Sequence, residues 1–174
     1  MQISTWTGKP FRAQVRVVVV FFAVLAVLNG LYQVEKRLSG QYFDIPYSSL
    51  VTSSVAYLGA WLMPFPVTVN GDIALGAGGN TVVVRGGCNG IEAIFLMVAG
   101  ILAVPATSNR RLLATAIYLP ILYILNLFRV LMLVYVVVVD PALFDTFHHQ
   151  VGQGVMVIAV MALWVHYVRR LEGN

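Results

Sequence analysis

Long apolar runs alternate with short polar segments along this chain of 174 residues. Crossing the roughly 30 Å hydrocarbon core of a bilayer takes about 20 residues of helix. Four runs approach or exceed this length, and polar or charged residues flank each of them. The pattern therefore predicts an α-helical polytopic membrane protein with transmembrane helices at about 17–34, 89–106, 112–139 and 151–168.

Basic residues indicate the orientation of these helices. Arg12 and Arg16 precede the first run, Arg110-Arg111 separates the second from the third, and Arg169-Arg170 follows the last. Cytoplasmic loops are enriched in Lys and Arg. Four spans place all these residues on the cytoplasmic side, together with both termini. Glu35-Lys36-Arg37 then lies outside, which weakens the charge bias slightly.

The segment 35–87 is expected to form a cap outside the membrane. Within it, 48–63 is rich in Ser and Thr, and its apolar residues fall short of a continuous span. A fifth span here would also move Arg110-Arg111 to the outside. We therefore predict an interfacial helix, with five side chains entering the lipid: Leu50, Tyr57, Leu58, Trp61 and Leu62.

Short strand patterns follow this helix. The apolar triplets 67–69 and 73–75 flank Asn70-Gly71, which favours a two-residue hairpin turn because both turn positions need positive φ. The glycine-rich stretch 76–80 predicts a looser turn into a strand at 81–85. The cap should therefore contain a small β-hairpin or meander.

Composition supports a membrane protein with a single domain, 1–174. Hydrophobic residues are 59% of the chain and charged residues only 10%, and the mean hydropathy is +0.83. An ordinary soluble domain carries about 25% charged residues. The net charge of +4 does not indicate nucleic acid, because the basic residues are scattered in short clusters beside apolar runs.

The single cysteine, Cys88, lies where the strand-like segment meets the second apolar run. A lone cysteine in a membrane protein is most often an inert apolar residue. Here Asn89-Gly90 follows it, and the amides of a helix N-terminus can stabilise a thiolate. Glu92, four residues on, shares its helical face and could hold a cation. A single thiol forms no disulfide within the chain, and a free thiol in an oxidising compartment is a liability unless it is used.

Two later runs carry the polar groups suited to partner a thiol. Arginine is costly in hydrocarbon and histidine is rare there, so Arg129 and His148 are functional candidates by default. Asn126, three residues before Arg129, lies on the same helical face. We therefore expect it to be a partner of the buried guanidinium. Gly152, one turn after His148, would let a helix or a substrate backbone approach. His149 is the alternative histidine.

The predicted topology brings these groups to one leaflet. Cys88 falls at the outer end of the second span and His148 at the outer start of the fourth. The third span would be about 42 Å long, which places Arg129 in its outer half. We therefore expect a membrane-embedded thiol enzyme in which Cys88 is a nucleophile with a depressed thiol pKa, partnered by His148 and Arg129. The ligand count excludes a usual zinc site, and no metal or cofactor is expected.

Three motifs resemble the signatures of the exosortase/archaeosortase family: Cys-x-Gly-Ile at 88–91, Asn-x-x-Arg-Val at 126–130 and His-x-x-x-Gly at 148–152. Their order, spacing and apolar surroundings are similar to the family pattern. The resemblance covers about 67–168 well and the first 65 residues in architecture only. The single span before the cap looks most like the compact exosortase H type.

The resemblance implies a cysteine transpeptidase of the cytoplasmic (inner) membrane with its active site facing the periplasm or outside. Such enzymes recognise secreted proteins with a PEP-CTERM-like C-terminal signal: a short motif, a transmembrane helix and a basic tail. Cleavage gives a thioester, which an amine or a lipid or glycan acceptor resolves. On this pattern Cys88 is the nucleophile, His148 the general acid/base and Arg129 the stabiliser of the oxyanion. Glu92 and the histidine pair at 148–149 differ from the residues that are usual in the family's motifs.

Two alternatives stay open. In a non-catalytic scaffold or small transporter, Arg129, Glu92 and His148 would form a structural polar network. A transporter usually shows discontinuous helices and an internal repeat, and neither is visible in the sequence. A plain membrane cysteine protease shares the site and differs only in whether water or an amine resolves the thioester.

Overall fold

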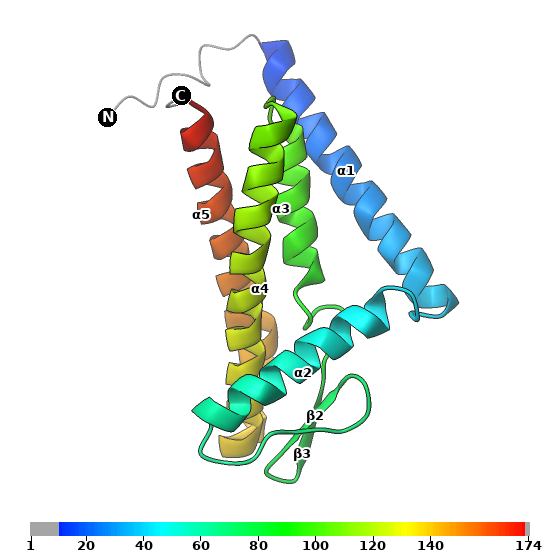
Figure 1. The fold of residues 1–174 in the computed structure, drawn as a ribbon, viewed down its shortest axis with the longest axis vertical. Helices are drawn as coiled ribbons and strands as arrows, with labels where there is room; N and C mark the ends of the chain where they lie inside the picture. Colours follow the sequence, from blue (N-terminus) through cyan, green and yellow to red (C-terminus); the bar gives the residue numbers. More distant parts are fainter. Residues whose placement is uncertain (1–10, 173–174) are drawn as a thin grey trace.

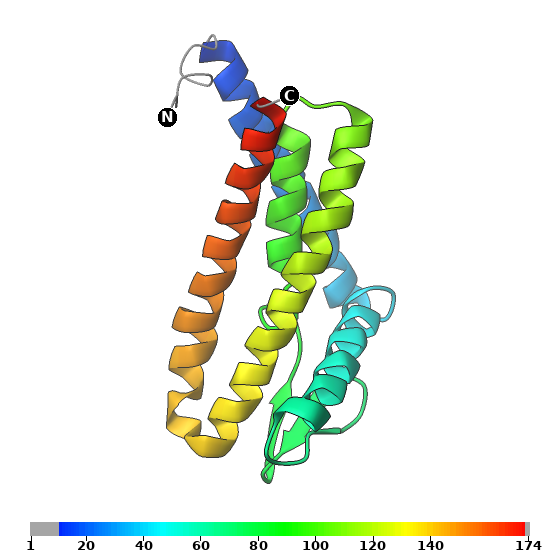
Figure 2. The same ribbon diagram turned by 60° about the vertical axis from the view of Figure 1, so that its left-hand side comes forward.

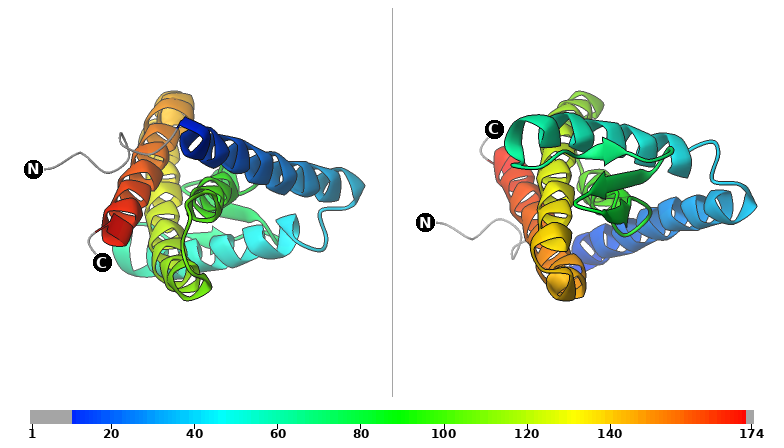
Figure 3. Two further views of the ribbon diagram at one scale, coloured as in Figure 1. Left: turned by 90° about the horizontal axis from the view of Figure 1, so that it is seen from above. Right: turned by 90° about the horizontal axis from the view of Figure 1, so that it is seen from below.

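The structure, a computed structural model, describes residues 11–172 and is that of a polytopic helical membrane protein. Four helices run lengthwise: α1 (Phe11–Leu38), α3 (Ile91–Ala103), α4 (Ser108–Val139) and α5 (Gln153–Glu172). A fifth helix, α2 (Asp44–Leu62), runs obliquely across the lower part of the bundle beside a small sheet (Figure 1). Viewed from either end, α3 lies between α1 and the pair α4 and α5 (Figure 3).

Three helices in the described part of the chain are long and apolar enough to cross a membrane: Gln14–Leu38, Ser108–Val139 and Thr146–Glu172. The predicted span at 89–106 is too long. Helix α3 has only 13 residues, about 20 Å of helix. It begins at Ile91 because Gly87 and Gly90, with φ of 92° and 80°, hold the preceding residues in a loop. It ends at Ala103 because the residue before Pro105 is driven to an extended conformation.

The ends of the helices group as the charge pattern predicts. The start of α1, the turn between α3 and α4, and the end of α5 lie together at one end of the molecule (Figures 1 and 2). Arg16, Arg110-Arg111 and Arg169-Arg170 belong to these segments. Helix α2, the sheet and the turn between α4 and α5 lie toward the opposite end. The cytoplasmic assignment of the basic end stays a prediction.

Helix α2 matches the predicted helix closely, with one side chain misplaced. Leu58 was expected to face lipid, but it packs against the core with Val51 and Val55. Positions 51, 55 and 58 share one helical face, and that face is turned toward α4. The other predicted lipid-facing side chains are exposed: Leu50, Tyr57, Trp61 and Leu62.

The sheet has three short antiparallel strands, β1 (Thr68–Val69), β2 (Ala74–Ala77) and β3 (Asn80–Val83), in that order. The prediction reversed the two turns. The tight turn is Gly78-Gly79, with φ of 55° and 81°, between the paired residues Ala77 and Asn80. Residues 70–73 form a longer loop in which only Gly71 has positive φ. Glycine adopts positive φ more readily than asparagine, so the Gly-Gly pair takes the tight turn.

The largest buried cluster joins α2, the sheet and the lower half of α4. This packing fixes the cap on α4 and holds the loop that carries Cys88, which is itself a member of the cluster. The other buried members are Val51, Val55, Leu75, Ala77, Val82, Val84, Leu127, Val130, Leu131, Leu133 and Val134.

Candidate active site

Cys88 lies in a tight loop between β3 and α3. The backbone N–H groups of Cys88 and Asn89 both donate to the carbonyl of Arg85, at 2.7 and 2.9 Å. Glu92 closes the loop from its other side, because its Oε1 accepts a hydrogen bond from the Gly87 N–H at 2.8 Å. The Cys88 side chain is only 5% exposed. The thiol is therefore held behind hydrogen-bonded backbone rather than displayed on the surface.

Asn89 attaches this loop to the first two helices. Its side chain is fully buried, and its Nδ2 donates to Ser48 Oγ at 3.1 Å and shares longer contacts of 3.4 Å with Tyr32 Oη and Asp44 Oδ1. Its Oδ1 accepts from the Ile91 N–H at 3.2 Å, at the start of α3. Buried polar networks whose members are bonded fix one geometry. Asn89, the neighbour of Cys88, thus locks the loop to α1 and α2.

Three members of this network were missed by the sequence reasoning: Tyr32, Ser48 and Asp44. Tyr32 donates to Asp44 Oδ1 at 2.5 Å, and Asp44 is only 3% exposed. The only sequence feature that pointed to this network was an acidic residue, Asp44, between two largely apolar segments. A buried carboxylate needs hydrogen-bond partners. The local sequence does not identify them, because Tyr32 and Asn89 lie 12 and 45 positions from Asp44.

Arg129 joins the cysteine loop to the histidine motif. Its side chain is 7% exposed, and its Nη2 donates to the carbonyl of Gly87 at 2.9 Å and to that of His148 at 3.4 Å. The three motifs, far apart in sequence, therefore meet at one guanidinium. The Nε–H of Arg129 is buried without a partner, so one strong donor is left for another group.

Asn126 does not partner Arg129 as predicted. Both polar atoms of its amide are buried with no hydrogen bond, and its side chain packs instead on Gly90. A Cβ at Gly90 would lie 2.5 Å from Asn126 Cγ. The reason is the loop conformation, which brings the Gly90 backbone directly over the amide. Unpaired buried amides are costly, so this group is suited to bind something that enters the site.

The histidine motif lies in a π-helical turn, η2 (Thr146–Gly152), that leads into α5. π-helical turns are frequent at functional sites. Gly152 faces Arg129, since a Cβ there would lie 2.7 Å from Arg129 Nε. The sequence predicts that a helix or a substrate backbone approaches Gly152, whereas in the structure the group that lies against it is the Arg129 guanidinium.

The two histidines differ in their surroundings. His148 is half-buried, its ring stacks on Phe144 with centroids 5.6 Å apart, and its Nδ1 is buried without a partner. His149 is exposed and meets the His148 ring edge-on at 4.5 Å. The geometry therefore favours His148 as the histidine that faces the interior.

The pKa of Cys88 differs from the expectation. Burial raises it to about 11, an effect that the positive charge of Arg129 partly opposes and the carboxylate of Glu92 reinforces. Among residues 11–172, no hydrogen bond joins the Cys88 thiol to the His148 ring. The predicted depressed pKa is therefore wrong for this state, because desolvation outweighs the single nearby cation.

A cavity of about 270 Å³ opens beside the site between α3, α4 and α5. Its polar end is formed by the Gly87 loop, Glu92 and Arg129, and the remainder is mostly apolar. Cys88 lies directly behind Gly87 and does not line the cavity. Within the described part of the chain, no group of three His, Cys, Asp or Glu side chains is placed to hold a metal ion. The lining residues are Gly87, Gly90, Glu92, Ala93, Leu96, Arg129, Gln153, Met156 and Val157.

Comparison with known proteins gives one result. A family model described as transmembrane exosortase matches residues 4–165. No curated protein and no solved structure shows significant similarity. The match spans most of the chain and includes all three motifs that meet at Arg129. The chain therefore belongs to the transmembrane exosortase family.

Proposed function

We propose that this protein is a membrane-embedded cysteine transpeptidase or protease that cleaves the C-terminal sorting signal of secreted proteins through a thioester. Exosortases in general act on secreted proteins that carry such signals. The observation that carries the proposal is the position of Arg129, whose guanidinium contacts the residue before Cys88 and the backbone of His148. One cation thereby bonds the backbone of the Gly87 loop and of the histidine motif, and it lines the adjacent cavity.

The unpaired polar atoms of the site argue against a purely structural network. Arg129 Nε, His148 Nδ1 and both amide atoms of Asn126 are buried without partners. A network retained for stability would satisfy these groups, since each unsatisfied one costs about 1–3 kcal/mol. Groups that bind a substrate are left free until it arrives. Tyr47, Arg111 and Tyr167 carry such atoms elsewhere, but four of the seven among the described residues gather at this site. This clustering supports a binding and reacting site over a scaffold.

The chemistry follows from the three side chains. The sulfur of Cys88 attacks the scissile carbonyl while His148 takes the thiol proton, and a tetrahedral oxyanion forms. Arg129 and the Asn126 amide donate to that oxyanion. The C–N bond then breaks, His148 returns the proton to the leaving amine, and a thioester remains. An amine acceptor resolves it in a transpeptidase, and water resolves it in a protease.

The raised thiol pKa has a consequence for this scheme. With a pKa of about 11, only about one thiol in 10⁴ is ionised at pH 7. A neutral, buried thiol resists oxidation outside the cytoplasm. Proton removal by His148 must therefore accompany the attack, after a substrate has entered and opened the loop.

The proposed setting is the cytoplasmic membrane, with both termini inside and the site toward the outer face. This orientation rests on the basic residues gathered at one end of the helices. It places the cap, α2 and the Cys88 loop where a secreted protein is presented. The acceptor is an amine or a group on a lipid or glycan, and the surrounding lipids are the remaining partners.

The test is processing of a reporter in cells. The reporter is a secreted protein of the same genome that ends in a short motif, one transmembrane helix and a basic tail. Co-expression with the wild type should shorten it, whereas Cys88→Ala, Cys88→Ser and His148→Ala should leave it full-length. His149→Ala should retain substantial activity. Wild-type processing by Cys88→Ala would end the proposal, and a thioester adduct on Cys88 seen by intact mass spectrometry would support it directly.

A further inference from the structure

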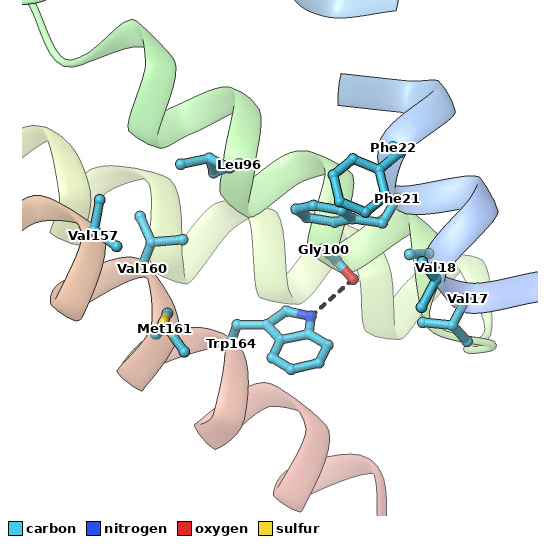
Figure 4. A pocket seen from close by; sticks show the side chains of 11 residues that line it. Val17, Val18, Phe21, Phe22, Leu96, Gly100, Val157, Val160, Met161 and Trp164 are labelled. Carbon is cyan, nitrogen blue, oxygen red and sulfur yellow. Dashed lines mark hydrogen bonds between the residues drawn. The ribbon is translucent and has the colours of Figure 1, made fainter. Parts of the chain in front are cut away.

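An apolar groove of about 390 Å³ runs along the membrane part of the molecule, between α1 and α5, with α3 at its base. Figure 4 shows side chains from all three helices pointing toward it. Trp164, its one side chain with a hydrogen-bonding group, donates its Nε1–H to the carbonyl of Gly100 at 3.1 Å. The groove therefore presents no unsatisfied polar side chain. Its lining residues are Val17, Val18, Phe21, Phe22, Leu96, Gly100, Ala103, Val157, Val160, Met161 and Trp164.

The groove is continuous with the candidate active site. Leu96 and Val157 line both the groove and the smaller cavity that holds Glu92 and Arg129. The connected space is apolar along the groove, and its polar side chains, Glu92, Arg129 and Gln153, all line the smaller cavity. An occupant held in the groove would therefore have one end beside the residues that react.

Helix α1 leaves one wall of this space unpartnered. In its most apolar 18-residue stretch only 6% of the residues are buried, whereas the corresponding share for α4 is 50%. Viewed from the ends, α1 runs outward from the remaining helices and touches the bundle mainly through α3 (Figure 3). The exposed faces of α1 and α5 thus form two sides of a slot that opens toward lipid.

We propose that this groove is the docking site for the transmembrane helix of the sorting signal, a role that rests on the proposed function. A spanning helix bonds all its interior backbone groups internally, so it suits a wall without polar partners. The first N–H groups of the sorting signal's helix are unpaired and carry the positive end of the helix dipole. In the proposed orientation this end lies at the cavity, where Glu92 supplies a carboxylate.

This placement also explains how the cleavage point is selected. The residues just before the bound helix emerge at the polar end of the space, next to Arg129 and the Gly87 loop. The depth at which the helix sits in the groove then sets which peptide bond meets Cys88. An acyl chain would fill the apolar part but would bring no peptide to the cavity.

Two pairs of variants test the docking site, because each pair changes neighbouring residues of similar exposure. Val18 and Val157 line the groove and are 54% and 48% exposed, whereas Val19 and Ile158 do not line it and are 58% and 69% exposed. Val18→Trp and Val157→Trp should slow processing of the reporter at least about tenfold, a change of about 1.4 kcal/mol. Val19→Trp and Ile158→Trp should stay within about twofold of the wild type.

Photo-crosslinking supplies the binding readout. In Cys88→Ala protein, a photoreactive benzoyl-phenylalanine at 18 or 157 should crosslink to the transmembrane helix of the same reporter, and one at 19 or 158 should not. Adducts with phospholipid alone, a crosslinked dimer of this chain, or no adduct would each overturn the docking site. Failure of the wild type to process the reporter would instead count against the proposed function, so the two failures are distinguishable.

Discussion

Gly152→Ala should displace the Arg129 guanidinium, because it adds one methyl group against that side chain. That methyl would lie 2.7 Å from Arg129 Nε and 2.9 Å from the Phe147 carbonyl, whereas ordinary contact begins at 3.4 Å. The guanidinium would have to move by about 0.7 Å to restore such contact. Its Nη2 now lies 2.9 Å from the Gly87 carbonyl, and a shift of this size would take it out of hydrogen-bonding range.

The expected loss follows from that hydrogen bond. A hydrogen bond to a charged group contributes about 1.5–3 kcal/mol. If the transition state depends on it, kcat/KM should fall about 10- to 150-fold. The backbone at Gly152 is not in the left-handed region, and alanine favours helix over glycine by about 1 kcal/mol. The clash with the Phe147 carbonyl is a backbone contact that cannot relax freely, so the variant should also melt below the wild type. Processing is therefore compared at equal amounts of folded protein, where the variant should still be slow.

Gly154→Ala is the matched control two residues on. A Cβ there would meet nothing within 4 Å, so activity should be unchanged. Processing rates come from quantitative immunoblots of the reporter, and stability from thermal melting of purified protein in detergent. Full activity in Gly152→Ala, or an equal loss in Gly154→Ala, would refute the idea that the position of the guanidinium limits the reaction.

Further predictions concern the charge, the thiol, the loop and the topology. Arg129→Lys keeps the charge but loses the planar fork, so processing should fall at least about a hundredfold at a normal protein level; a protein that no longer accumulates would favour a structural role. Alkylation of Cys88 by N-ethylmaleimide, followed by intact mass, should accelerate about tenfold per pH unit from pH 8 toward 11, because burial raises the pKa and thiolate forms only as pH rises; a plateau below pH 8 contradicts this. Asn89→Ala should lower the melting temperature, since it removes the buried contacts to α1 and α2; an unchanged melt would mean that the loop is held elsewhere. In Cys88→Ala protein, a thiol introduced at Gly71 should react with an impermeant maleimide in intact cells, and reaction only after permeabilisation would reverse the topology.

Patterns in the sequence predict the membrane class and single out the candidate site residues. The length of an apolar run can be read directly from the sequence, and it predicts the membrane helices. Polar groups are costly in hydrocarbon, so Arg129 and His148 stand out as candidates from the sequence alone. The basic clusters predicted which helix ends lie together. Helix α2 and the presence of a small sheet were also predicted, because each depends on a pattern within about twenty residues.

Local details failed where two solutions were close in energy. Both Asn70-Gly71 and Gly78-Gly79 suit a tight turn, and strand pairing selected the second. The helix that was expected to begin at 89 begins at Ile91, because Arg129 holds the glycine-rich loop that precedes it. Leu58 turned inward because α4 offers α2 a surface to pack on.

The construction of the site depends on packing between segments that lie far apart in the chain. Arg129 could have bonded Asn126 on its own helix, but the packing of α3 and α5 brought two backbone carbonyls within its reach instead. Asn89 finds Ser48 and Tyr32 across 41 and 57 residues, a pairing that no local pattern encodes. The thiol pKa rises because desolvation depends on everything packed around Cys88, and the groove exists because α1 leans away from α5. Such features depend on many contacts between distant segments. The sequence therefore identifies the candidate groups, and the packing sets their partners, their burial and their access.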